Sequence, residues 1–528
     1  MSTRADVLVN GLWRPSSGGD SFKSVNPDSG AAGGAYPISP WEELAECLMA
    51  GAAAYEAMVD LPVEAIANFL EQFASRVEDR SVELVEIAHV ETALPVSPRL
   101  TDIELPRMVD QLRQAAAAAR ARTWKRPVIS SVARVASLYE AVPGVVCVFG
   151  PNNFPFAFNS IGGGDFASAV ATGHPIIGKA NPGHPETTRL LAEEADLAAG
   201  ESGLPSGFIQ LVYRTTHADG ARLVADPRLA ATAYTGSRGA GLALKSAADA
   251  TGNLIYLEMS SINPVVVLPG AWAERGSELA AELVGSMLLG VGQFCTSPGL
   301  LLVQDGPEIG AIRDDLKAEL ENAPSGTLLG EGVVAGLEQV AEHWLAAGAG
   351  VVGSAAPATQ SVCVFPNSMM EVGGKDFLAQ PDALQAEAFG NLSLLVVCSD
   401  LDELIQCLGV VEGNLTGSIY SAQDGSDDLA YAAISPVLRQ RVGRLLNDKP
   451  PTGVAVVAGM NHGGPYPSTG HPGFTAVGIP ASLERFGMLQ CYDNVRDDRL
   501  PPELQAANPL GMARSVDGEV TSDAVAWG

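Results

Sequence analysis

The chain has 528 residues, of which 47% are hydrophobic and 18% charged, and its 61 acidic and 32 basic side chains give a formal net charge of -29. An acidic surface repels phosphate backbones and anionic membranes, so we expect neither nucleic-acid nor membrane binding. No apolar run approaches the ~20 residues needed to span a bilayer, and the first 20 residues lack the pattern of a signal peptide, which predicts a cytoplasmic protein.

The first 140 residues predict strands, then helices, then a hairpin. Short apolar runs broken by Gly, Pro, Ser and Asn indicate strands at 7–13 and 22–25. Apolar residues spaced three and four apart predict helices over 42–120. Residues 122–140 place apolar side chains among polar ones, which is typical of an extended hairpin that faces solvent or a second subunit.

From residue 145 onward, apolar strands alternate with helices, which indicates parallel β-α-β units. The predicted strands are 145–149, 176–178, 208–212, 231–234, 254–257 and 265–268. The predicted helices between them are 165–172, 187–199, 217–225 and 239–250. A second α/β stretch is expected over 277–444, with buried strands at 300–303, 361–365 and 394–398. We place a domain boundary within 258–273 and expect an extended or partly ordered tail after residue 493.

Several local motifs carry no function in this interpretation. The segment 173–180 resembles a phosphate-binding loop, but Ala180 follows Lys179 where such a loop needs Ser or Thr to hold Mg²⁺. The seven histidines have no acidic or cysteine partner at metal-ligand spacing, so no metal site is predicted. The seven cysteines include no CxxC pair and are expected to be free thiols. The glycosylation sequons at Asn391 and Asn414 are interpreted as chance matches.

Cys295 stands in the Gly- and Pro-bounded turn 292–298, directly after a predicted helix. A structural cysteine usually lies inside an apolar run, as Cys398 does, and Cys295 does not. Backbone N–H groups around a thiol in a polar loop can lower its pKa and make it a nucleophile. Cys295 is therefore a candidate nucleophile, with an inert thiol as the alternative.

Two further polar side chains follow predicted strands, where parallel sheets place their ligands. Glu258 ends the apolar run 254–257, and a carboxylate in apolar surroundings suits a general base. Asn153 follows 145–149, and its amide can donate to a developing oxyanion. In isolation each has a plainer interpretation, which is a capping or ion-paired acid for Glu258 and an Asx turn for Asn153.

Together the segments 150–156, 258–264 and 292–298 resemble the aldehyde dehydrogenase superfamily, and the resemblance covers nearly the whole chain. The segments 258–264 and 292–296 and the tail 500–504 are most similar to the branch that includes NADP-dependent 2-ketoglutarate semialdehyde (2,5-dioxopentanoate) and fatty aldehyde dehydrogenases. The resemblance implies an α/β fold with a Rossmann-type cofactor-binding domain (1–121 and 143–258), an α/β catalytic domain (259–487), an oligomerisation hairpin and strand (122–142 and 488–500) and a C-terminal tail (501–528).

The resemblance also implies a role for each matched residue. Cys295 would form a thiohemiacetal and then a thioester, Asn153 and the backbone N–H of Cys295 would hold the oxyanion, and Glu258 would activate the hydrolytic water. The retained Glu258 argues against a CoA-acylating relative. The implied cofactor-binding residues are Lys179 at the adenosine ribose, Gly236, Ser237 and Gly241 at the pyrophosphate, and Glu387 and Phe389 at the nicotinamide ribose.

The resemblance favours NADP over NAD as the cofactor, although NAD stays possible. Many NAD-preferring members carry a glutamate three residues after the matched lysine, and this chain has Pro182 there. Without that acid a 2′-phosphate meets no repulsion and Lys179 can attract it. Arg214 is a candidate second phosphate ligand, with a surface arginine at a strand end as the plainer interpretation.

The expected reaction oxidises a small-molecule aldehyde, 2,5-dioxopentanoate, to 2-oxoglutarate. The alternatives are a medium-chain fatty aldehyde dehydrogenase and, less favoured, a non-catalytic protein of the same fold. The candidates to bind the carboxylate of a semialdehyde are Arg107, Thr296 and Ser468. A tunnel that favours alkyl chains would instead be lined by Phe156, Phe158 and Phe474.

Two further expectations concern thiol chemistry and assembly. A redox-sensing role for Cys295 would need a resolving cysteine close by, and the nearest in sequence is Cys363. Members of the superfamily assemble through an extended hairpin and a C-terminal strand, matched here by 122–140 and 488–494. A homodimer or homotetramer is therefore expected.

Overall fold

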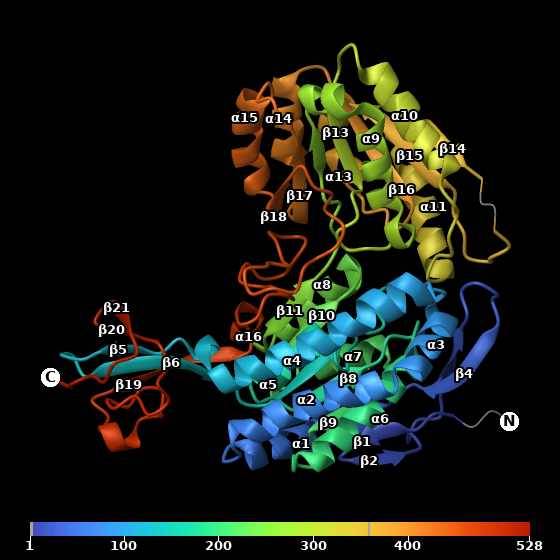
Figure 1. Cartoon of the computed structure of the whole chain (residues 1–528). Helices are drawn as coiled ribbons and strands as arrows, with labels where there is room; N and C mark the ends of the chain where they lie inside the picture. Colours follow the sequence, from blue (N-terminus) through green and yellow to red (C-terminus); the bar gives the residue numbers. More distant parts are fainter. Residues whose placement is uncertain (1–3, 357–358) are drawn as a thin grey trace.

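The computed structural model describes residues 4–356 and 359–528, which form two α/β bodies and a projecting arm (Figure 1). The first body is built on a seven-stranded sheet in the order β11-β10-β7-β8-β9-β1-β2. Its parallel strands are β7 (Val145–Phe149), β8 (Ile176–Lys179), β9 (Ile209–Val212), β10 (Leu229–Thr235) and β11 (Ile255–Glu258), and β1 (Val7–Val9) and β2 (Leu12–Arg14) add an antiparallel edge.

Helices bury the parallel strands of the first body, which explains their continuous apolar runs. The helices of this body are α1 (Trp41–Met58), α2 (Val63–Asp79), α3 (Ser81–Thr92), α4 (Leu105–Ala121), α5 (Gly164–Ala171), α6 (Pro185–Glu201), α7 (His217–Val224) and α8 (Arg238–Asp249). A π-helical segment (Val96–Glu104) leads into α4, and a separate hairpin of β3 (Ser21–Val25) and β4 (Ala32–Pro37) lies beside the body. The strands and helices predicted between residues 145 and 258 are confirmed.

The second body repeats this design with a seven-stranded sheet in the order β14-β15-β16-β13-β12-β17-β18, in which only β14 is antiparallel to its neighbour. Its strands are β12 (Val265–Val267), β13 (Leu300–Gln304), β14 (Gly350–Ala355), β15 (Asn367–Gly373), β16 (Leu392–Cys398), β17 (Asn414–Tyr420) and β18 (Val442–Asn447). Its helices are α9 (Pro269–Leu288), α10 (Ile309–Asn322), α11 (Glu331–Ala346), α12 (Gly374–Ala379), α13 (Pro381–Leu384), α14 (Leu401–Val410) and α15 (Asp428–Arg439).

The strand predicted at 361–365 is wrong. This segment is irregular, and the N–H of Val362 donates to the carbonyl of Asp28 instead of to a neighbouring strand. Pro366 has no N–H to donate to a sheet, and β15 begins at Asn367 directly after it. The fold agrees with the interpretation of the two glycosylation sequons as chance matches, because Asn391 and Asn414 are both buried.

The arm is a five-stranded sheet that projects to the left of the two bodies in Figure 1, in the order β19-β6-β5-β20-β21. The predicted hairpin forms β5 (Val128–Ser130) and β6 (Val135–Ala141), and β6 pairs with β19 (Gly487–Asp493). The tail contributes β20 (Arg514–Val516) and β21 (Glu519–Thr521), which the sequence did not predict. Its Leu500 and Leu504 close a small core against Ile129 and Leu138.

The chain crosses between the two bodies twice, and both crossings meet at the end of β11. The backbone N–H of Met259 donates to Ser468 at 2.8 Å, and Gly470 donates back to Leu257 at 3.0 Å. After this contact, the segment with Phe474 and α16 (Ala481–Glu484) packs into the core of the first body, although it lies within the predicted catalytic domain. Glu258 is thereby held at the junction of the two bodies.

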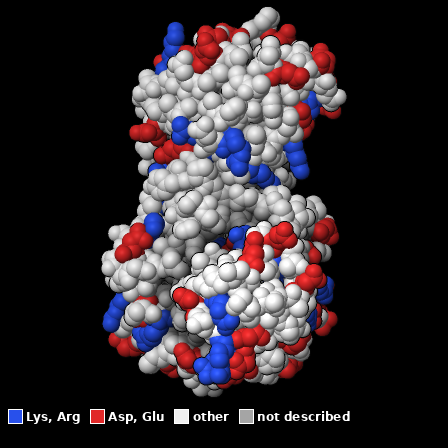
Figure 2. All heavy atoms as spheres, turned by 90° about the vertical axis from the view of Figure 1, so that its left-hand side faces the viewer, with Lys and Arg blue, Asp and Glu red and all other residues white. Residues whose placement is uncertain are grey.

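In the part of the chain that the structure describes, no helix combines the length and apolarity of a membrane span. Figure 2 shows acidic and basic side chains interspersed on the face that it draws, without a continuous basic surface there. Location in the cytoplasm and the absence of nucleic-acid binding stay predictions.

Candidate active site

A tight backbone turn presents Cys295 at the junction of the bodies. Gly290 and Gly292 have φ values of 59° and 70°, and a Cβ on Gly292 would lie 2.1 Å from the carbonyl oxygen of Gly390. Only glycine fits there. The side-chain amide of Asn263 donates to the carbonyls of Cys295 and Ser297, both at 2.9 Å, and so fixes the turn to the linker that follows Glu258.

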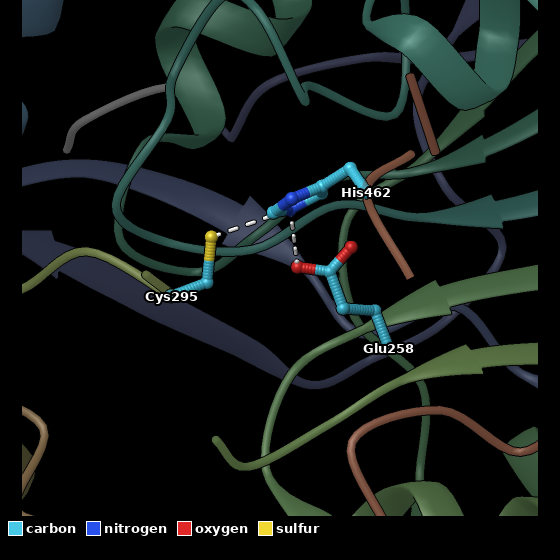
Figure 3. A group of neighbouring side chains, drawn as sticks. All are labelled: Glu258, Cys295 and His462. Atoms are coloured by element: carbon cyan, nitrogen blue, oxygen red, sulfur yellow. Dashed lines mark hydrogen bonds and ion pairs between the residues drawn. The ribbon is translucent and has the colours of Figure 1, made fainter. Parts of the chain in front are cut away.

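Cys295, Glu258 and His462 form a compact cluster (Figure 3). The Nε2 atom of His462 lies 3.4 Å from the sulfur of Cys295 and 3.0 Å from Oε1 of Glu258. His462 and Glu258 are both buried, and Oε2 of Glu258 has no hydrogen-bond partner among the described residues. One nitrogen thus faces both a thiol and a carboxylate and can exchange a proton with either.

The sequence did not predict His462, because it lies 167 residues from Cys295 in a glycine-containing loop without a spacing motif. The ligand atoms of Cys295, Glu258 and His462 lie within 4.8 Å of one another, which is a geometry that could also hold a metal ion. Residue spacing alone therefore missed this cluster. All seven cysteines are free, and the sulfur of Cys295 bonds to His462 rather than to another cysteine in the described chain.

The expected lowering of the Cys295 pKa is wrong. Burial and the neighbouring charge of Glu258 raise the pKa of this thiol well above its usual value, and the opposing charge of Arg107 only partly offsets them. The thiol is consequently protonated at neutral pH. A nucleophilic attack by its sulfur needs an adjacent base, and His462 is in position to accept the proton.

Replacement of His462 by alanine should slow alkylation of Cys295 by iodoacetamide at pH 8 at least about tenfold, because the thiol loses its proton acceptor. Peptide mass spectrometry measures the rate, and the exposed Cys491 provides an internal reference in the same sample. His471→Ala is the matched control, since this exposed histidine accepts a hydrogen bond from Gly473 in its own loop and its ring packs edge-on against Tyr256. An unchanged rate at Cys295 would exclude His462 as the base.

Asn153 is held beside Cys295 by a buried ion pair. Its amide nitrogen donates to the carbonyl of Gln293 at 2.9 Å, and its own carbonyl accepts from Arg99 at 2.9 Å. Arg99 pairs with Glu104 at 2.6 Å, and Glu104 also accepts the N–H groups of the loop after Asn153, at Phe156 and Ala157. The second amide hydrogen of Asn153 and the N–H of Cys295, which has no acceptor among the described residues, are free to bind an oxyanion.

A cavity of about 1020 Å³ opens over the C-terminal ends of β11, β10, β7 and β8 and reaches Cys295. The last residue of each strand lines it, at Glu258, Thr235, Phe149 and Lys179. These four strands span about 15 Å at ~4.8 Å per strand, so the cavity has the length and volume of a site for a ligand larger than a single nucleotide.

The predicted site residues gather around this cavity with one exception. Its lining includes Asn153, Lys179, Arg214, Gly236, Ser237, Glu258, Cys295, Glu387 and Phe389. Gly241 is buried behind the cavity, where an added Cβ would lie 3.0 Å from the Tyr234 ring and 3.2 Å from the sulfur of Met259. Its absent side chain lets α8 pack closely on the sheet.

The donors in the cavity suit a dinucleotide with an added phosphate. Ser237 precedes α8, whose first turn has no side-chain cap, so its N–H groups are free to bind a pyrophosphate. Lys179 and Arg214 both line the cavity, and Pro182 leaves no carboxylate beside them. Burial and the charge of Arg214 lower the pKa of Lys179 to about 8.

Glu387 lines the same cavity as Cys295. It accepts the N–H of Ser261 at 3.3 Å, and burial raises its pKa to about 7, which the nearby charge of Glu258 reinforces. Its carboxyl group can therefore accept hydrogen bonds from a ligand hydroxyl when it is ionised.

Residues 13–433 match the sequence profile of the aldehyde dehydrogenase family. The chain belongs to this family. Alpha-ketoglutaric semialdehyde dehydrogenase 2 of Azospirillum brasilense is 40% identical over 483 residues, which cover 88% of this chain and 89% of that protein. Alpha-ketoglutaric semialdehyde dehydrogenase of Acinetobacter baylyi is 33% identical and covers 87% of each chain.

Solved structures confirm the aldehyde dehydrogenase fold. The NAD⁺ complex of an aldehyde dehydrogenase from Bacillus cereus superposes on this chain with a TM-score of 0.79 at 17% identity, over 93% of this chain and 96% of that one. At this identity the likeness concerns the fold alone. The roles of individual residues in this aldehyde dehydrogenase depend on its own geometry.

Proposed function

We propose that this aldehyde dehydrogenase oxidises 2,5-dioxopentanoate to 2-oxoglutarate with NADP⁺. The observation that carries the proposal is the cluster of Cys295, His462 and Glu258 at one end of a dinucleotide-sized cavity that also contains Lys179. The substrate follows from the two relatives named alpha-ketoglutaric semialdehyde dehydrogenases, at 40% and 33% identity over most of the chain.

In the proposed mechanism, neutral His462 has its hydrogen on Nδ1, and Cys295 attacks the aldehyde carbon as its proton moves to Nε2 of His462, 3.4 Å away. Once protonated, Nε2 donates to Oε1 of Glu258. The new carbon–sulfur bond gives a thiohemiacetal, whose oxyanion accepts hydrogen bonds from Asn153 and the N–H of Cys295. Arg99 and Glu104 keep Asn153 in place during this step. A bound nicotinamide cofactor would supply the hydride acceptor that turns the thiohemiacetal into a thioester.

Glu258 is proposed to activate the water that hydrolyses the thioester. Its Oε1 atom is bonded to His462, whereas the buried Oε2 atom has no protein partner and can accept a hydrogen bond from a water molecule. Hydrolysis breaks the carbon–sulfur bond and returns the thiol of Cys295, with the carboxylic acid as product. Glu387 would bind the cofactor ribose on the opposite side of this water.

NADP⁺ is the proposed cofactor because Lys179 and Arg214 are both available to a 2′-phosphate. Neither forms an ion pair with a carboxylate in the described chain, in contrast to Arg238, which pairs with Glu412 at 2.8 Å. Two cations next to one another destabilise the charged form of Lys179, and a dianionic phosphate between them would relieve this repulsion. The same repulsion makes cofactor binding dependent on pH.

NADP⁺ should bind progressively more weakly above pH 8, approaching a tenfold loss of affinity per pH unit, while NAD⁺ shows a smaller change. Lys179 loses its proton as the pH rises through about 8, and only the charged form attracts the phosphate. Fluorescence titration between pH 7 and 10 measures the two affinities with the reduced forms, NADPH and NADH, which differ in the same 2′-phosphate. Lys179→Met should remove the difference between the cofactors, and the control Lys245→Met, which removes an ion pair with Asp249 on α8, should not.

The function is tested by cofactor reduction with purified protein, with NADP⁺ and NAD⁺ each assayed against 2,5-dioxopentanoate and hexanal. The proposal expects the highest kcat/KM for 2,5-dioxopentanoate with NADP⁺. Faster turnover of hexanal would assign the protein to the fatty aldehyde branch. Folded protein that reduces neither cofactor with either aldehyde would contradict the proposed substrate class.

The arm is proposed to join subunits into a homodimer or homotetramer. Several apolar side chains on its strands and turns are exposed in the single chain, namely Val128, Val132, Met488, Leu489 and Val520. Burial of such side chains between two arms would stabilise an assembly. Sedimentation or light scattering measures the oligomeric state directly.

A further inference from the structure

Arg107 is a cation next to the reactive cluster that forms no ion pair with a carboxylate in the part of the chain that the structure describes. It lies in the first turn of α4, and its Nε donates to Gln111 at 3.1 Å. Its Nη2 atom is buried and has no hydrogen-bond partner in residues 4–356 or 359–528. The adjacent carboxylate of Glu104 pairs with Arg99 instead, at 2.6 Å. A buried guanidinium nitrogen without an acceptor is unfavourable unless a ligand completes its hydrogen bonds.

The surroundings of Arg107 direct it toward the chemistry. Its guanidinium carbon lies 5.0 Å from the centre of the Phe158 ring, and the His462 ring lies 5.7 Å from the same ring. Charge interactions with Cys295 and Glu258 are among those that act on the pKa of Arg107, so the guanidinium is close to both groups. Arg107 does not line the dinucleotide-sized cavity. We infer that it approaches Cys295 from the side that the cofactor leaves free.

The other side chains considered for the substrate carboxylate, and the second arginine near Cys295, are bonded within the protein to different extents. The Ser468 hydroxyl donates its hydrogen to the carbonyl of Pro465, whereas the Thr296 hydroxyl accepts the N–H of Gly453 and offers an anion at most one neutral O–H donor. Arg444 donates through both terminal nitrogens to the carbonyls of Pro451 and Gly453 and holds that loop, so only its Nε lacks an acceptor among the described residues. The aromatic residues considered for an alkyl tunnel, Phe156, Phe158 and Phe474, are all buried in the core of the first body. Arg107 differs from Arg444 in that its unpartnered nitrogen is a terminal one, Nη2, which a substrate can reach end-on.

We propose that the guanidinium of Arg107 binds the carboxylate of the substrate and selects aldehydes that carry an acid group at the far end of a short chain. This assignment rests on the proposed function. Gln111 holds Nε, and itself donates to the carbonyl of Ala157 at 3.0 Å, so the planar head of Arg107 is fixed with Nη2 free. A carboxylate accepts from such a head with charge-assisted hydrogen bonds, and the Phe154 and Phe158 rings exclude water around it. An aldehyde without an acid group would leave the same nitrogen unpaired.

The test compares kcat/KM for 2,5-dioxopentanoate and hexanal in the wild type, Arg107→Met, Arg107→Lys and the control Arg113→Met. Arg113 lies on the same helix and pairs with Glu78 at the surface. In Arg107→Met, kcat/KM for 2,5-dioxopentanoate should fall about 10- to 150-fold, mostly through a higher KM. The fall in kcat/KM for hexanal should be at least tenfold smaller. Arg107→Lys keeps the positive charge but not the planar guanidinium with its two terminal nitrogens, and its kcat/KM for 2,5-dioxopentanoate should fall by an intermediate factor. Inhibition by glutarate should be weaker in both Arg107 variants than in the wild type.

The outcomes separate this assignment from the proposed function. A wild type that prefers hexanal contradicts the proposed function itself. A wild type that prefers 2,5-dioxopentanoate, with equal losses on both aldehydes in the Arg107 variants, overturns the role of Arg107 alone, since a merely structural residue affects both substrates. If Arg107→Met does not fold, the ratio of the two substrates in Arg107→Lys and the glutarate inhibition of that variant decide the question in the same way.

Discussion

Replacement of Cys295 by alanine is expected to abolish aldehyde oxidation, with a fall in turnover of at least about 10³-fold. The sulfur is the strongest nucleophile of the three groups in the described cluster, and neither the carboxylate of Glu258 nor the imidazole of His462 gives a thioester. Neither a thiohemiacetal nor a thioester can then form. Alanine is smaller than cysteine and removes no hydrogen bond that holds the turn, because Asn263 binds the backbone carbonyl of residue 295.

Stopped-flow measurement of cofactor reduction checks this result, together with the melting temperature and NADPH affinity of the variant. Cys491→Ala is the matched control, since Cys491 is exposed on the arm and should retain full turnover. Residual turnover above about a tenth of the wild-type rate in Cys295→Ala would mean that another nucleophile acts. The mechanism proposed for this aldehyde dehydrogenase would then be wrong.

Replacement of Glu258 by glutamine is expected to stop the reaction after its first half. Glutamine preserves the shape, and its amide oxygen can accept a hydrogen bond from Nε2 of His462 once that nitrogen has taken the Cys295 proton, but its amide cannot take a proton from water. We expect one equivalent of reduced cofactor per active site in a rapid burst, followed by steady turnover that is about 10²- to 10⁴-fold slower than in the wild type. The thioester on Cys295 should be visible by mass spectrometry of the intact protein.

Glu371→Gln is the control for this experiment, because Glu371 is paired with Arg313 at 2.6 Å on a strand of the second body. Full steady turnover in Glu258→Gln would show that another base activates the water. Loss of the burst along with turnover would place the action of Glu258 before the thioester, in the transfer of the proton from Cys295 through His462. The two measurements thus separate the two proton transfers that the geometry allows.

The sequence by itself determined the parallel strands and the polar residues at their ends. Apolar runs such as 145–149 and 254–257 can be buried only between helices, so their C-terminal ends must share one edge of a sheet. Asn153 and Glu258 follow these runs directly, and a resemblance in short motifs could therefore locate both of them and Cys295 around one cavity. A local sequence pattern is sufficient to predict a site residue where that residue directly follows, in the chain, the strand that positions it.

Only the tertiary structure decided the chemistry around Cys295. His462 and Arg107 lie far from Cys295 in the chain, in segments whose own residue patterns indicate a loop and an ordinary helix. The direction of the Cys295 pKa shift depends on burial and on the charge of Glu258, and neither can be read from the turn that contains the cysteine. The tail was likewise predicted as extended, and its pairing with the arm depends on a partner strand almost 400 residues earlier. Hydrogen bonds, charge interactions and strand pairing act through space, and the chain brings such residues together only when it folds.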